Sequence, residues 1–209
     1  MPNPSPRFAA LTYLNYWLGS GRRIHNALNS TDREAQLVAM SDTAKRFRIA
    51  RNFHTKYDTG KGLSRYKPIL DVIDGLTPDD FADDLASSVL AVRDRLSVLY
   101  GGTNVLSGTT KFLWAKLRFP IVIYDRQARI AIGTRSGDLS AYYDVWFDRF
   151  SASRDSIRDA CRSLVDMRDY TCDPIIATPD YLSELAASDW FHHRVFDILL
   201  WHEGMPESG

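Results

Sequence analysis

The sequence predicts an all-α protein. Apolar residues recur at three- and four-residue spacing through most of the chain, as in Phe81, Leu85, Val89 and Val92, which is typical of amphipathic helices. Capping residues, prolines and glycines separate these periodic segments, and no segment alternates polar and apolar residues as a strand would. The chain has 209 residues, of which 44% are hydrophobic, enough for one buried core. We therefore expect a single domain over residues 1–209, built from about eight to ten short helices.

The first half of the chain predicts four helices. Residues 8–18 are apolar and aromatic, and the Gly19-Ser20-Gly21 run should end that helix. Ser30 or Thr31 should cap a second helix that continues to about residue 54, and residues 55–64 form a loop. A short helix follows at 68–73. Thr77 and Pro78 then provide a cap and a first helical residue for a helix that ends at the glycines 101–102.

The second half predicts further short helices. Residues 109–117 form one, which the Arg118-Phe119-Pro120 run interrupts, and the β-branched residues 121–123 form an extended piece. Asp125 is placed to cap the next helix, which runs to about residue 132. The remaining helices are expected at 139–150, 153–170, 179–187 and 189–202.

Charge is distributed in blocks, although the formal net charge is zero. Residues 45–67 hold eight Lys and Arg against one Asp, and residues 101–135 hold six against one. Residues 68–100 and 136–209 are acidic. A basic block can lie on a polyanion while the acidic elements face away, or the blocks can pair with each other inside the fold. The charges alone leave both possibilities open.

Several kinds of protein are disfavoured. The chain contains no GxxxxGK[ST] phosphate loop and no GxGxxG, HExxH, CxxC or GxSxG motif. Its two cysteines are too few for a disulfide framework or a structural zinc site. No apolar run reaches the ~18–20 residues that cross a bilayer, and the N-terminus has no secretory pattern. We expect a cytoplasmic protein without a membrane partner, metal or organic cofactor.

The stretch 105–132 carries the most chemical information. The small residues 107–110 should present backbone amides at a helix start, where phosphate binds readily. Lys111 follows in the first helical turn, where the helix dipole mildly disfavours a cation, so a phosphate contact or a reaction role would explain it. Asp125 comes fourteen residues later, after the apolar residues 121–124. A carboxylate there could stabilise a developing cation, or it could serve only as a helix cap.

This stretch resembles the helix-hairpin-helix superfamily of DNA glycosylases, in particular small bacterial proteins with an 8-oxoguanine-glycosylase fold. The similarity covers about 30 of the 209 residues: the Ser/Thr-rich turn, Lys111-Phe112-Leu113-Trp114, Phe119-Pro120-Ile121, Tyr124-Asp125 and Ala128. The usual Gly-x-Gly-x-Lys hairpin retains only Gly108 here. The resemblance implies a helix-hairpin-helix bundle, with the hairpin and the catalytic segment at about 101–135, acting on DNA as a monomer.

The resemblance also implies roles for individual residues. Asp125 would support an oxocarbenium-like sugar or activate the nucleophile. Lys111 would form a Schiff base with the sugar, or would contact a phosphate while water acts as the nucleophile. The residues expected to contact DNA are Gly108, Thr109, Thr110, Arg126, Gln127, Arg129, Arg48, Arg51, Lys56, Lys61, Arg65 and Lys67. Trp190, His193 and Tyr57 are candidates for a base pocket, although tryptophans are more often core residues.

We therefore expect a DNA glycosylase that serves repair or acts against phage DNA with modified bases. Two alternatives remain. The chain could be a helical protein that binds DNA or a partner without chemistry. It could also be a metal-dependent nuclease that uses the aspartates among residues 79–84.

Overall fold

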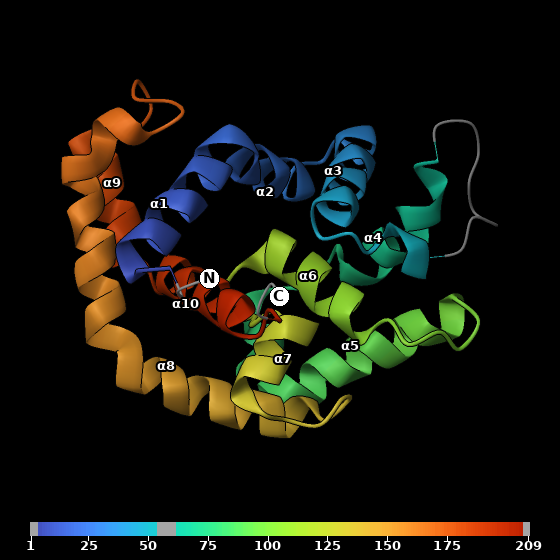
Figure 1. The fold of residues 1–209 in the computed structure, drawn as a ribbon. Coiled ribbons are helices and arrows are strands. Elements are labelled where there is room, and N and C mark those ends of the chain that lie inside the picture. Colours follow the sequence, from blue (N-terminus) through green and yellow to red (C-terminus); the bar gives the residue numbers. More distant parts are fainter. Residues whose placement is uncertain (1–3, 54–61, 207–209) are drawn as a thin grey trace. The chain divides into compact units, whose positions relative to one another are not determined.

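A computed structural model describes residues 4–53 and 62–206 (Figure 1). These residues are helical and contain no strand, which confirms the all-α prediction. The chain divides into two compact units. Unit 1 consists of Met1–Gly21 and Asp125–Gly209, and unit 2 consists of Arg22–Tyr124.

Unit 1 is organised around a long helix, drawn in orange in Figure 1. This helix, α8, packs against α1, α9 and α10, and α7 packs against α10. Trp146 of α8 is fully buried and lies at the centre of an aromatic core. The elements of unit 1 are α1 (Pro6–Tyr16), the π-helical turn η1 (Trp17–Gly21), α7 (Arg126–Ile132), α8 (Leu139–Arg162), the 3-10 helix η6 (Ser163–Tyr170), α9 (Pro179–Ala187) and α10 (Asp189–Glu203).

Unit 2 is organised around α6, whose Phe112 and Leu113 are fully buried. Helix α6 packs against α2, α3 and α5, while α4 packs against α3 and α5. The elements of unit 2 are α2 (Arg22–Leu28), α3 (Arg33–Arg46), the 3-10 turns η2 (Ala50–Asn52), η4 (Ser64–Tyr66) and η5 (Pro78–Phe81), α4 (Lys67–Ile73), α5 (Leu85–Leu99) and α6 (Leu106–Leu117).

The Gly19-Ser20-Gly21 run does not stop the helical path, contrary to the sequence prediction. Residues 17–21 form the π-helical turn η1, and α2 follows at once, a helix that the sequence reading missed. A Cβ at Gly21 would lie 2.9 Å from the Trp17 ring. Glycine is therefore used here for close packing inside a wide turn.

Two other boundaries differ from the prediction. Helix α3 ends at Arg46, because Arg48 adopts φ +54° and the amide of Ile49 turns back to the carbonyl of Ala44. The helices expected at 139–150 and 153–170 are instead α8 and the adjoining η6. Nothing in residues 151–152 breaks the helix, so α8 continues to Arg162.

Most of the predicted helix starts lie close to the observed starts, and the predicted extended piece at 121–123 lies outside the helices. Asp125 caps α7 and Thr178 caps α9, each through a side-chain hydrogen bond to a backbone amide. Thr77 starts only the 3-10 turn η5, and Asp84 provides a second cap, for α5. Helix α3 is capped by Asp32 rather than by Ser30 or Thr31.

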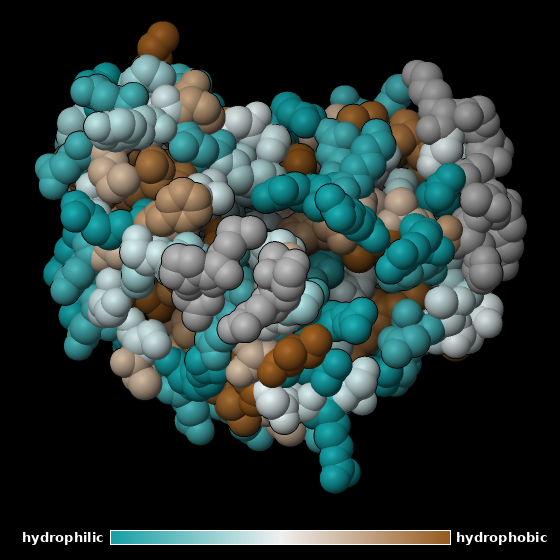
Figure 2. Space-filling model, viewed as in Figure 1, coloured by the Kyte–Doolittle hydropathy of each residue, from teal (hydrophilic) through white to brown (hydrophobic). Residues whose placement is uncertain are grey.

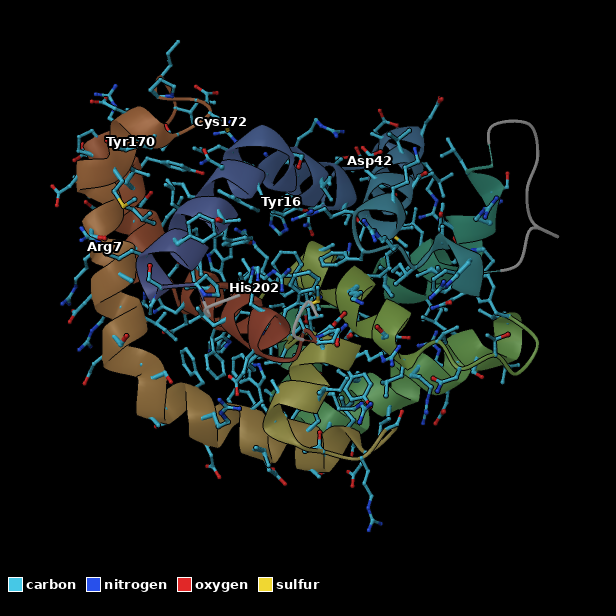
Figure 3. The ribbon with its side chains drawn as sticks, in the orientation of Figure 1. Arg7, Tyr16, Asp42, Tyr170, Cys172 and His202 are labelled. Carbon is cyan, nitrogen blue, oxygen red and sulfur yellow. The ribbon has the colours of Figure 1, made fainter. Side chains whose placement is uncertain are left out.

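The loop after η6 is tied to α1. Asn15 donates to the carbonyl of Tyr170 at 3.2 Å, and its Oδ1 accepts the amide of Cys172 at 2.6 Å. Figure 3 shows Tyr170 and Cys172 at this end of unit 1. Cys172 is exposed and Cys161 is buried, and neither forms a disulfide.

The surface is largely polar over α3, as Figure 2 shows. Among the described residues, no helix combines the length and apolar character that crossing a membrane requires.

Helix α7 meets the end of α10 at Gly204, where two backbones come into contact. A Cβ on Gly204 would lie 1.9 Å from the carbonyl oxygen of Gln127. Gly204 has φ −82° and ψ 0°, which any residue can adopt, so the requirement for glycine is steric.

We expect Gly204→Ala to lower the free energy of unfolding by about 2–3 kcal/mol, because α7 must move away from α10. Gly75→Ala is the control, since a Cβ at Gly75 would meet nothing within 4 Å. Urea denaturation followed by circular dichroism measures both variants. Equal stabilities of the two variants would contradict the observed contact.

The C-terminal end of α6 is capped by side chains from α2. The Nδ1 atom of His25 lies 3.2 Å from the carbonyl of Ala115, and Nε2 lies 2.7 Å from the Arg118 guanidinium. Since a guanidinium only donates, Nε2 accepts and Nδ1 carries the proton. Burial and the neighbouring Arg118 charge lower the pKa of His25 to about 4.

This arrangement predicts acid sensitivity. Between pH 6.5 and 4 the unfolded chain protonates His25 and the folded chain does not, so stability falls as the pH is lowered through this range. His25→Gln should show a smaller decrease in unfolding free energy between pH 7 and 4.5 than wild type. Between pH 7 and 8.5 the two proteins should have parallel profiles. If the unfolding free energies of the two proteins also change in parallel at acidic pH, the pKa of His25 is not lowered in the folded state.

Candidate active site

Asp125 stands at the N-terminus of α7, as the sequence predicted. Its backbone is extended (φ −121°, ψ 148°), and its side chain accepts the amide of Gln127 at 2.9 Å. The carboxylate is half-buried, whereas the neighbouring Arg126 is exposed. The amide stabilises negative charge on Asp125 and holds its side chain in one orientation. This acid is therefore both positioned and partly accessible.

A second acid of unit 1, Asp197 on α10, lies in the electrostatic field of Asp125. Asp197 is 4% exposed. Its Oδ1 accepts Trp146 Nε1–H at 2.9 Å, and its Oδ2 lies 3.4 Å from the Arg194 guanidinium. Burial raises the pKa of Asp197 to about 6, and the Asp125 charge adds to that shift. Burial, together with the negative charge of Asp197, raises the pKa of Tyr143 above its usual range.

Sequence analysis missed Asp197 and its partners Trp146 and Arg194. One signal was present: an aspartate three residues after an arginine, inside an otherwise apolar run of a helix. An acid in such a run either lies at a position where the helix surface is exposed, or is buried together with hydrogen-bond or ion-pair partners. Only the fold distinguishes these two cases.

The candidate base-pocket residues of α10 pack in separate aromatic groups. The His193 ring contacts Trp146 and Phe150, and burial lowers the pKa of His193 to about 4. The Trp190 ring lies 4.7 Å from the Trp17 ring and also contacts Tyr13. Trp190 and His193 thus have different aromatic partners in these contacts. Tyr57 lies outside the described residues.

The small residues 107–110 are not a turn ahead of a helix, because α6 already begins at Leu106. Gly108, Thr109 and Thr110 are buried within it. The amide of Thr109 donates to the carbonyl of Val105, and the Thr110 hydroxyl accepts the amide of Tyr124 at 3.0 Å. A Cβ at Gly108 would lie 2.7 Å from the Phe53 ring. These residues thus have packing roles inside unit 2.

Lys111 belongs to unit 2 and is 4% exposed. Its Nζ donates to Ser107 Oγ at 2.9 Å and lies 5.6 Å from the centre of the Phe47 ring. Lys116, one and a half turns later, is also buried, and its Nζ lies 3.2 Å from the Leu28 carbonyl and 3.5 Å from Asp74. Helix α6 therefore buries two cations, of which the sequence reading had singled out only Lys111.

The predicted DNA-contacting cations differ in their surroundings. Arg48, Arg51, Lys67 and Arg126 are exposed, and none of them has an ion pair within the described part of the chain. Other residues of the set are engaged: Arg65 donates to the carbonyl of Gly62, and Arg129 donates to that of Thr134. Gln127 is half-buried, and its Oε1 has no hydrogen-bond partner among the residues that the structure describes. Lys56 and Lys61 lie outside the described residues.

The aspartates among residues 79–84 include one helix cap, Asp84, and the capping-box partner of Thr77, Asp80. Asp80 accepts the amide and the hydroxyl of Thr77, and Asp84 does the same for Ser87. These hydrogen bonds lower the pKa of both carboxyls. Within residues 4–53 and 62–206, no group of three or more His, Cys, Asp or Glu side chains is arranged to hold a metal ion.

Comparisons of the chain with protein-family models, with curated proteins and with solved structures find no match.

The protonation of Asp197 should be measurable as stability. Because its folded pKa is raised to about 6, the folded state takes up a proton between pH 6 and 4 before the unfolded state does. The stability of wild type relative to Asp197→Asn should therefore increase as the pH falls from 7.5 to 4.5, by about 2 kcal/mol. Urea denaturation at both pH values measures it. A pH-independent difference would mean that Asp197 titrates in its ordinary range.

Proposed function

We propose that this protein is a DNA glycosylase that hydrolyses the N-glycosidic bond of a damaged or modified base. The observation that carries the proposal is the Asp125 carboxylate. It is half-buried, held by the amide of Gln127, and directly follows the buried apolar residues 121–124. The resemblance of residues 105–132 to helix-hairpin-helix glycosylases supports the same reading.

The chemistry needs one negative charge at a defined place. When the bond between sugar and base breaks, the base leaves with the bonding electrons, and positive charge develops on C1′ and the ring oxygen. A carboxylate beside the sugar stabilises that charge, and water then adds to C1′ and loses a proton, which the departed base takes up. Asp125 is the residue proposed for this role. No metal or organic cofactor enters these steps.

Binding of DNA requires cations that are not already paired with acidic side chains of the protein. Residues 22–124 hold 16 Lys and Arg against 11 Asp and Glu, and the remaining residues hold 10 against 15. Arg48, Arg51 and Lys67 belong to the basic unit and are exposed. Their free guanidinium and ammonium groups favour phosphate binding over pairing within the fold.

Lys111 fits a supporting role better than that of a nucleophile. An attacking amine must be accessible and uncharged, whereas Nζ of Lys111 is buried and donates to Ser107. We therefore propose an enzyme that uses water as its nucleophile. We also propose that it acts in the cytoplasm as a monomer, either in repair or against phage DNA that carries modified bases.

Asp125→Asn tests the proposal. Asparagine also caps helices, so α7 should persist while the negative charge is lost. We expect base release to fall by about 10²–10⁴-fold, with DNA affinity unchanged. Mass spectrometry of free bases measures it, on DNA containing 8-oxoguanine, uracil or alkylated bases and on hypermodified phage genomes.

Asp138→Asn is the matched control. Asp138 caps α8 through the amide of Ala141 and belongs to the same unit, so its variant repeats the loss of an acidic cap elsewhere. It should release bases at the wild-type rate. If wild type releases no base from any DNA but still binds it, the protein is a DNA-binding protein without this chemistry.

A further inference from the structure

Unit 2 has a surface groove of about 670 Å³ that sequence analysis did not single out. Its lining comes from the length of α4, the end of α5 and the turn η4: Ser64, Lys67, Pro68, Asp71, Val72, Arg95 and Leu99. The lining includes two cations, Lys67 and Arg95, and three apolar residues, Pro68, Val72 and Leu99, which we call the apolar wall.

The groove is held in shape by buried contacts beneath it. Ile69, Leu70 and Ile73 of α4 are fully buried, and so is Leu96 of α5. The hydroxyl of Tyr100, at the end of α5, donates to the carbonyl of Arg65 just before α4. The lining side chains therefore project from two helices that are fixed to each other.

The two cations of the groove are available to a ligand. Lys67 and Arg95 are both exposed, and neither has a carboxylate within 4 Å in the described part of the chain. The acid of the groove, Asp71, is already paired with Arg33. The adjacent Arg93 is different, because it is paired with Asp94 at 2.7 Å. The groove thus presents two unneutralised positive charges.

We propose that this groove binds a DNA strand, with phosphates on Lys67 and Arg95 and sugar carbons against Pro68, Val72 and Leu99. The proposal rests on the proposed function and adds Arg95 and the apolar wall to the DNA-binding surface. Alternating anionic and apolar groups are the chemistry of a nucleotide backbone. The carboxylates of an acidic peptide could pair with the cations, but such a peptide has no sugar carbons to cover the apolar wall.

Titrating fluorescent duplex and single-stranded oligonucleotides at several salt concentrations tests the proposal. Lys67→Gln and Arg95→Gln should each weaken binding about three- to tenfold near 100 mM salt. Each should also reduce the slope of log K against log salt by about 0.7–0.9. Arg93→Gln removes the same charge from the same helix but does not line the groove, so it should change neither quantity appreciably. Melting temperatures near that of wild type establish that all variants are folded.

The apolar wall has its own test. Leu99→Asn should weaken DNA binding while leaving the salt slope unchanged, because it removes contact with sugar carbons and no charge. Competition with polyglutamate distinguishes the ligand classes. If polyglutamate displaces DNA as well as unlabelled DNA does, the groove is a general site for polyanions and the assignment to DNA is wrong.

The outcomes separate this proposal from the proposed function. Suppose that wild type binds DNA and releases a base, but that Lys67→Gln and Arg95→Gln leave the slope of log K against log salt unchanged. The groove proposal is then overturned, and the glycosylase proposal is retained. If the slopes fall as expected but no base is released, the groove binds DNA and the glycosylase is overturned. If wild type binds no DNA at all, both are overturned.

Discussion

The close approach of α10 to α7 at Gly204 determines where Asp125 stands within unit 1. The Gln127 carbonyl occupies the space that any side chain at position 204 would need, and the Gln127 amide is the donor to Asp125. One residue therefore connects the packing of the two helices with the orientation of the acid. The same packing places Asp125 in the electrostatic field of Asp197, the buried acid of α10. The candidate site thus depends on a backbone contact that only glycine permits.

Both units bury ionisable groups, and both supply partners for them. In unit 2, Lys116 lies beside Asp74 and the Leu28 carbonyl, and Gln36 donates to Asp74 and to the Ser30 carbonyl. In unit 1, Asp197 accepts from Trp146 beside Arg194. Removing water from a charge is costly, and these partners offset the cost without yielding much net stability. Such groups instead restrict how the helices can pack, because a shifted helix would leave a charge without its partner.

Local signals account for what the sequence predicted, and long-range packing accounts for what it missed. The cap of α7 at Asp125 could be read because capping involves residues close in sequence. The continuation through Gly19–Gly21 could not, because it depends on how Trp17 packs within the wide turn. The small residues before Lys111 were interpreted as a turn at a helix start, since composition cannot distinguish glycine in a turn from glycine beneath the Phe53 ring. Asp197 was missed because its partner Trp146, on α8, lies 51 residues away in sequence.

The uneven distribution of charge has a consequence that the zero net charge hides. Residues 22–124 have five more bases than acids, and the rest of the chain has five more acids than bases. A polyanion is thus attracted to one unit and repelled by the other, which orients the encounter as well as strengthening it. Under the proposed function, affinity would come from the cations of unit 2 and chemistry from a carboxylate of unit 1. Charges that attract the strand and the charge that stabilises the sugar cation have opposite signs, so they are best carried by different parts of the chain.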